Sequence, residues 1–197
     1  AAGKFLVAPG LLALGLIRFF HALVPAPFPP TFLHPLILLN HVVVLSTVAY
    51  WWEEKRPALT RWQVLAVLGG LAVIDLAGVL LWVWREAPVS QQHINSGLAA
   101  AALAGGFILA AAMIWRRHRR STTGGRHLML MGLLWLIGYD AAFVSFYVSF
   151  WSGVAIMLLA PLAFASVRLM RWWATWIGLT QRPEFRRPDK DATRDGG

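Results

Sequence analysis

Long apolar segments recur along the whole chain, and they constrain its fold more than any other feature. A helix needs about 20 mostly apolar residues to cross a bilayer. Six segments approach or exceed that length, at residues 5–24, 34–52, 62–84, 94–115, 128–147 and 153–173. The sequence therefore predicts an all-α polytopic transmembrane helix bundle of about six spans within residues 1–177. The polar residues 178–197 are expected to form a disordered cytoplasmic tail.

The composition leaves little room for any other domain. Hydrophobic residues make up 58% of the 197 residues, and the mean hydropathy is +0.58. The absence of cysteine excludes disulfides, thiolate metal sites and covalently attached haem. The first apolar segment has Lys4 before it but no small-residue cleavage site after it, so we expect a retained span. Any chemistry must take place in the bundle or at its rim.

Basic residues predict the orientation of the bundle. Five arginines occur between the fourth and fifth segments, at positions 116, 117, 119, 120 and 126. Cytoplasmic loops of membrane proteins carry such an excess of Arg and Lys. Alternation then places both termini in the cytoplasm, as expected for a bacterial cytoplasmic (inner) membrane protein. The net charge of +9 is thereby explained without a nucleic-acid partner; the expected partners are lipids and other membrane subunits.

Local signals refine the predicted helices. His34 is expected to cap the second span, with Pro35 in its first turn, where the missing N–H is harmless. Pro161 is expected to kink the sixth span. The pairs at 69–70 and 105–106 are glycines, which favour close approach between helices.

Four charged or titratable residues are expected to share one layer of the membrane. Helices rise 1.5 Å per residue, which places each of them about 9–13 Å below the outer boundary. They come from four different spans: Arg18, His41, Asp75 and Asp140. Carboxylates in hydrocarbon are costly and normally face a partner, a cavity or a proton path. The layer is either an ion-pair network of Arg18 with the aspartates, or a site where His41 and an aspartate handle protons or a ligand.

Three histidines are expected at the outer rim, above this layer. His21 ends the first span, His34 begins the second and His93 opens the fourth. Neutral imidazoles on neighbouring helix ends bind metal ions or ligate a b-type haem. A haem would take His34 or His41 on one side and His93 on the other, whereas a metal ion would use His21, His34 and His93. Solvated interfacial histidines are the structural alternative.

These features favour an integral membrane subunit of an electron-transfer system, with one b-type haem or metal ion near the outer face. Whether the chain is an enzyme stays open; a non-catalytic or electron-transfer subunit fits best. One alternative is a cofactor-free accessory or scaffold subunit of a larger respiratory or photosynthetic complex. Another is a small proton- or ion-coupled transporter that uses His41, Asp75 and Asp140.

Three short motifs resemble a bacterial family of uncharacterised small polytopic membrane proteins. They are His34-Pro35-Leu36 at a span start, His93-Ile94-Asn95 opening a later span that ends in Trp115-Arg116-Arg117, and Gly138-Tyr139 in the closing span. The resemblance covers residues 31–148 and implies a four-helix core with two histidines at one membrane face. It implies no established activity. This chain departs from the pattern in Asp140 and in an extra span on each side.

Overall fold

The computed structural model describes residues 7–24, 32–53, 58–84, 89–118 and 121–177. Their regular structure is entirely helical, as predicted. The helices are α1 (Val7–Leu23), α2 (Leu33–Trp52), α3 (Arg61–Trp84), α4 (Gln91–His118), α5 (Thr122–Tyr147), α6 (Phe150–Met157) and α7 (Leu159–Trp176). The predicted tail and most of the connecting loops lie outside the described residues.

Five helical stretches are long and apolar enough to cross a bilayer. They are Leu33–Trp52, Arg61–Trp84, Gln91–His118, Thr123–Tyr147 and Phe150–Trp176. α1 is also apolar but has only 17 residues. The chain is therefore a helical membrane protein.

Helix starts are fixed by side-chain caps that the local sequence supplies. Thr60 and Gln63 exchange hydrogen bonds with each other's backbone N–H at the start of α3, which is the reciprocal capping box. Ser121 and Ser149 each accept a backbone N–H in the first turn of α5 and α6. The expectation that His34 caps α2 is wrong: the cap position is Phe32, and its side chain makes no capping bond. Pro35 lies in the first turn, as predicted.

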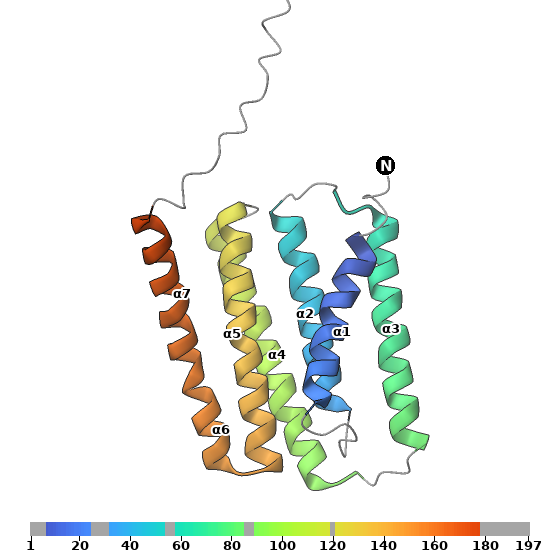
Figure 1. Ribbon diagram of the computed structural model, residues 1–197. Coiled ribbons are helices and arrows are strands. Elements are labelled where there is room, and N and C mark those ends of the chain that lie inside the picture. The colour runs from blue at the N-terminus through green and yellow to red at the C-terminus, as the bar shows by residue number, and fades with distance from the viewer. Residues whose placement is uncertain (1–6, 25–31, 54–57, 85–88, 119–120, 178–197) are drawn as a thin grey trace, which may run out of the picture. The chain divides into compact units, whose positions relative to one another are not determined.

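Residues 1–160 form one compact unit, which contains α1 to α6. Successive helices from α1 to α5 run in alternating directions (Figure 1). The starts of α2 and α4 therefore lie at the same end of this unit as the ends of α1, α3 and α5. α2 contacts α1, α3 and α5, and α5 also contacts α4 and α6. This topology brings the predicted rim histidines to one end of the bundle.

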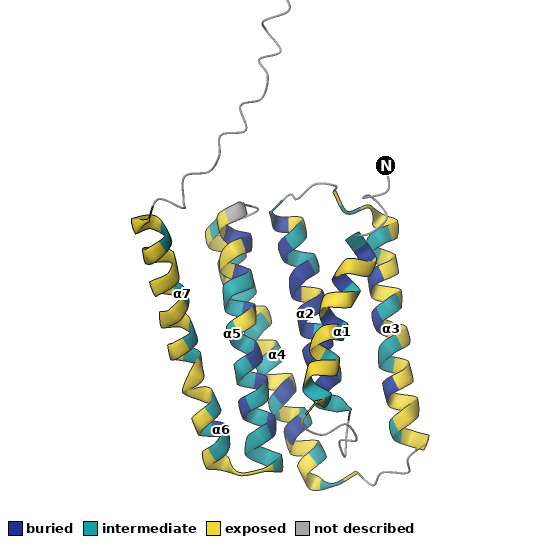
Figure 2. Cartoon of the chain, viewed as in Figure 1, coloured by how far each residue is buried: buried dark blue, intermediate teal, exposed yellow. Residues whose placement is uncertain are grey.

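α2 is the central helix of this unit, and it is the most buried (Figure 2). Its sequence is apolar around the whole circumference, as expected of a helix enclosed by others. Leu39 and Val43 are completely buried and pack against Leu11 of α1 and Leu71 of α3. Gly15 of α1 makes this packing close, since a Cβ there would lie only 3.0 Å from the Leu39 carbonyl oxygen.

Other glycines act in the same way. Of the predicted pairs, Gly70 meets Leu12 and Gly106 meets Trp135, whereas Gly69 and Gly105 face open space. Gly132 packs on Leu45 and Gly153 on α5, and the sequence analysis had not singled out these two.

The helix interruption near Pro161 agrees with the predicted kink. α6 ends at Met157 and α7 begins at Leu159. Pro161 has no N–H to donate to the carbonyl four residues earlier, and its ring clashes with that carbonyl. Residues 161–197 form a second unit, whose described part is helical; there Arg168 lies over the Phe164 ring at 5.3 Å.

Candidate functional site

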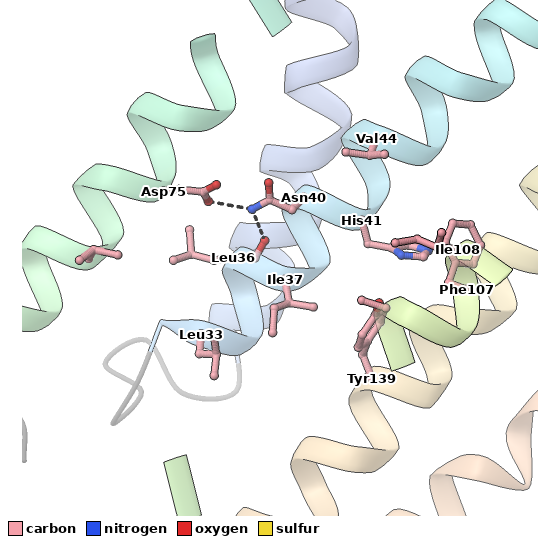
Figure 3. A pocket seen from close by; sticks show the side chains of 12 residues that line it. Leu33, Leu36, Ile37, Asn40, His41, Val44, Asp75, Phe107, Ile108 and Tyr139 are labelled. Carbon is pink, nitrogen blue, oxygen red and sulfur yellow. Dashed lines mark hydrogen bonds between the residues drawn. The ribbon is translucent and has the colours of Figure 1, made fainter. Parts of the chain in front are cut away.

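Asp75 of α3 is held by a side chain of the central helix. Asn40 donates its amide N–H to one carboxylate oxygen of Asp75 at 2.7 Å and to the Leu36 carbonyl oxygen at 2.9 Å (Figure 3). The second bond fixes the Asn40 amide against its own helix. The other oxygen of Asp75 makes no hydrogen bond to any described residue. This carboxylate therefore has one protein donor and one unused acceptor.

Asp140 of α5 makes a separate pair with His34 of α2. The distance between His34 Nε2 and the carboxylate oxygen is 2.8 Å, and the two side chains are 24% and 44% exposed. The His34 ring also packs on Phe143, with centroids 4.6 Å apart. A carboxylate accepts, so Nε2 carries a proton. Asp75 and Asp140 consequently have different partners, although both of these partners belong to α2.

Arg18 takes no part in either arrangement. Its side chain is exposed, and within the described ranges the His34–Asp140 contact is the sole ion pair. The predicted network of Arg18 with the aspartates is therefore not formed among these residues. Neutral or histidine donors from α2 occupy the places at which a guanidinium was expected.

His41 is buried between α2, α4 and α5. Its Nε2 lies 3.0 Å from the Gly132 carbonyl oxygen, and its ring makes edge contacts with Phe107 and Tyr139. A carbonyl oxygen only accepts, so Nε2–H is the donor and Nδ1 is left with the lone pair of a neutral imidazole. In Figure 3, His41 and Asn40 leave α2 in different directions, His41 towards Phe107 and Asn40 towards Asp75.

A pocket of about 450 Å³, here called the lateral pocket, lies between these residues. Its polar lining comes from Asn40, His41, Asp75 and Tyr139. The Tyr139 hydroxyl makes no hydrogen bond to another described residue. The remaining lining is apolar: Leu33, Leu36, Ile37, Val44, Val79, Ala104, Phe107 and Ile108. The lateral pocket thus combines an apolar wall with a few polar groups, as ligand sites commonly do.

A second, smaller pocket of about 220 Å³, here called the rim pocket, adjoins the first. The two share Leu33, Leu36 and Val79. Trp82 and His93 also line the rim pocket, and in the described part of the chain Trp82 Nε1 and His93 Nε2 are buried without a hydrogen-bond partner. A buried donor without an acceptor costs about 1–3 kcal/mol. Two such nitrogens beside one pocket are therefore unusual.

His93 has a fixed tautomer because of its position in a helix cap. The Ser90 backbone N–H donates to His93 Nδ1 at 3.0 Å, and the Ser90 hydroxyl lies 2.7 Å from the same atom. The His93 backbone N–H points back to the Ser90 hydroxyl, so Ser90 and His93 form a capping box with histidine in the acidic position. Nδ1 accepts, so the proton of the neutral ring is on Nε2.

The hydrogen bonding of His93 differs from that of a typical haem or metal ligand. A metal-bound imidazole presents a nitrogen lone pair and usually donates its other N–H to an acceptor. His93 shows the reverse arrangement, because Nδ1 accepts and Nε2 carries the proton. His34 and His41 each donate Nε2–H to an acceptor, which leaves Nδ1 as the nitrogen with the lone pair, and His21 is exposed. No three His, Asp or Glu side chains of the described residues are grouped as metal ligands would be.

Comparison of the chain with protein-family models, with curated proteins and with solved structures gives no significant match. The two pockets and the side chains that line them are therefore the features that bear on function.

The sequence did not identify Gly78, Val79 and Trp82 as companions of Asp75. They lie on one face of α3 by helical spacing and line one or both pockets. Trp82 lies near the end of α3, where a tryptophan is expected simply as an interfacial residue. Trp82 follows Asp75 by seven residues, which is about two helical turns. This spacing indicates that the two side chains lie on the same face of α3.

Proposed function

We propose that this protein binds a lipid-soluble small molecule in the lateral pocket, as a non-catalytic subunit of a membrane electron-transfer system. The observation that carries the proposal is the unused acceptor of Asp75 beside about 450 Å³ of mostly apolar space. A carboxylate in hydrocarbon with a single donor is costly. A ligand that donates an O–H to this oxygen would remove part of that cost.

Lipid-soluble hydroquinones have the chemistry that this pocket selects. Their ring and tail suit the walls formed by Leu36, Val79 and Ile108, and a phenolic O–H donates to a carboxylate. They also carry electrons within membranes, which connects the pocket to the class of function that the sequence favours. The three polar groups Asp75, His41 and Tyr139 would orient the ring.

The matched pair of aspartates gives a test. The full-length protein in nanodiscs should bind decyl hydroquinone saturably, at one site per chain, as measured by equilibrium dialysis. Asp75→Asn should weaken binding about 10- to 150-fold, since hydrogen bonds to charged groups contribute about 1.5–3 kcal/mol. Asp140→Asn should leave binding unchanged, because Asp140 does not line the pocket. Absence of saturable binding, or an equal loss in both variants, would contradict the proposal.

We also propose six spans with both termini on the cytoplasmic side of a bacterial inner membrane, with α1 as the first and shortest. The five arginines at positions 116–126, from the last turn of α4 to the beginning of α5, support this orientation. The chain has no cysteine, so single cysteines report topology cleanly. Gln92→Cys should react with an impermeant maleimide on intact cells, and Thr123→Cys only after permeabilisation. The opposite pattern would reverse the proposed orientation.

The b-type haem subunit is the competing proposal, and His93 is the observation in its favour, because its Nε2 is buried and unbonded. Ligation would require His93 to give up the bonds that Ser90 donates to Nδ1. A reduced-minus-oxidised spectrum of the purified protein separates the two proposals. A haem α-band would establish the competing one, whereas its absence is expected here.

A further inference from the structure

The rim pocket is distinguished by two buried N–H donors without acceptors. Trp82 comes from the end of α3 and His93 from the start of α4, and neither nitrogen has a partner among the described residues. An indole N–H only donates. The Ser90 bonds to Nδ1 make His93 Nε2 a donor as well. Both N–H groups therefore need a hydrogen-bond acceptor. A ligand group that can only donate a hydrogen bond cannot pair with them.

The rest of the rim pocket determines which acceptor is suitable. Its other lining residues are Phe32, Leu33, Leu36, Gly78, Val79, Val89 and Ile94. Among the described residues of this lining none is Lys or Arg, so none of them compensates the charge of a phosphate or carboxylate. An uncharged oxygen, such as a ketone or quinone carbonyl, accepts from both donors without bringing a charge into apolar surroundings.

The two pockets are neighbours, which bears on the size of the molecule. Leu33, Leu36 and Val79 belong to both linings, so these three side chains are what the two pockets have in common. The rim pocket offers donors, and the lateral pocket offers the acceptor oxygen of Asp75. A ring with oxygens on opposite sides suits this polarity.

We infer that the rim pocket binds the carbonyl oxygen of a lipid-soluble quinone, which accepts hydrogen bonds from Trp82 Nε1 and His93 Nε2. The inference rests on the proposed function, because the remainder of the same molecule occupies the lateral pocket. It adds a recognition element for the oxidised ligand, because the quinone carbonyl accepts hydrogen bonds in the rim pocket. Asp75 instead interacts with the hydroxyl of the reduced form.

Two probes with the same tail test the carbonyl directly. Decylubiquinone carries carbonyl oxygens, and decylbenzene carries none. The full chain in nanodiscs should bind decylubiquinone more tightly than decylbenzene. Trp82→Phe and His93→Phe should each weaken decylubiquinone binding about two- to tenfold, as expected for one lost hydrogen bond. Decylbenzene binding should not change in either variant, and this result also shows that the variants fold.

Two further variants serve as controls. Trp84→Phe removes an indole two residues away that is 81% exposed, and it should have no effect. His93→Gln keeps an N–H donor and should retain most of the affinity that His93→Phe loses.

The outcomes separate the two proposals. If both probes bind the native protein equally, or if Trp82→Phe behaves like Trp84→Phe, the carbonyl site is refuted while binding in the lateral pocket stands. If neither probe binds, both proposals fail. If didecanoyl phosphatidylglycerol displaces decylubiquinone at equal concentration, the donors serve a lipid ester, and the quinone assignment is overturned.

Discussion

The two sides of helix α2 differ more than its sequence suggests. Val43 is completely buried, whereas its neighbour Val44 is 46% exposed and lines the lateral pocket. On the first side, Gly15 brings the backbone of α1 against Leu39 and Val43. On the second side, Asn40 and Val44 face the space between α3 and α4. One side is closed by packing, and the other is kept open.

The difference shows how a mostly apolar helix acquires a binding face. Apolar side chains contact protein and lipid about equally well, so burial of apolar area does not close a gap between membrane helices. Closure requires a small residue that allows backbone approach, as Gly15 does. Where large side chains such as Phe107 and Ile108 line the neighbouring helix, space remains.

The largest effect is expected from filling the closed side. Gly15→Leu should destabilise the protein by about 1–3 kcal/mol, because the new side chain meets the Leu39 backbone, which has little freedom to move. Gly69→Leu is the matched control, since a Cβ there meets nothing within 4 Å. The measurement is reversible unfolding in mixed micelles. Equal stability of the two variants would mean that the α1–α2 side is not closed.

Filling the open side should affect binding and leave stability nearly unchanged. Val79 is 48% exposed and lines both pockets. Val79→Trp should reduce decyl hydroquinone binding at least tenfold, or about 1.4 kcal/mol, because the indole occupies the space of the ligand. Its unfolding should stay within about 0.5 kcal/mol of the native protein, as for surface substitutions. A large loss of stability would show that this side is packed after all.

The smallest effect concerns the third contact of α2, the one with α5. A double-mutant cycle of His34→Phe and Asp140→Asn should give a coupling energy of about 0.6 kcal/mol, the average for interhelical hydrogen bonds in membranes. These side chains are partly exposed, which weakens the pair. The same cycle on Asn40 and Asp75 should give a similar value. A coupling energy near zero for His34 and Asp140 would mean that this pair does not hold α2 against α5. The side of α2 that faces α1 would then be the one shown to be closed.

Much of this organisation was available in the sequence. Apolar length predicted the helices, and the Thr60–Gln63 and Ser121 patterns account for where α3 and α5 begin. The need of Asp75 and Asp140 for polar partners also followed from their apolar surroundings. The identity of these partners did not follow from the sequence. Arg18 was expected to pair with the aspartates, whereas Asn40 bonds to Asp75 and His34 bonds to Asp140.

The reason lies in helix geometry. Sequence position gives the depth of a residue, because each residue adds 1.5 Å along the axis. It placed Arg18, His41, Asp75 and Asp140 in one layer. Which of them meet depends on the rotation of each helix about its axis, and successive residues differ by about 100°. That rotation is set by contacts such as Gly15 on Leu39, which only the folded bundle contains.

The sequence by itself therefore determined that this chain is an all-helical membrane protein with polar residues buried in its apolar helices. The tertiary structure decided that Asn40 holds Asp75, that His93 presents an N–H, and that Trp82 shares a pocket with it. Hydrophobicity along the chain depends only on the order of the residues, so it is the same in any packing arrangement. The direction of a hydrogen bond and the shape of a pocket exist only once neighbouring helices fix each other's rotation.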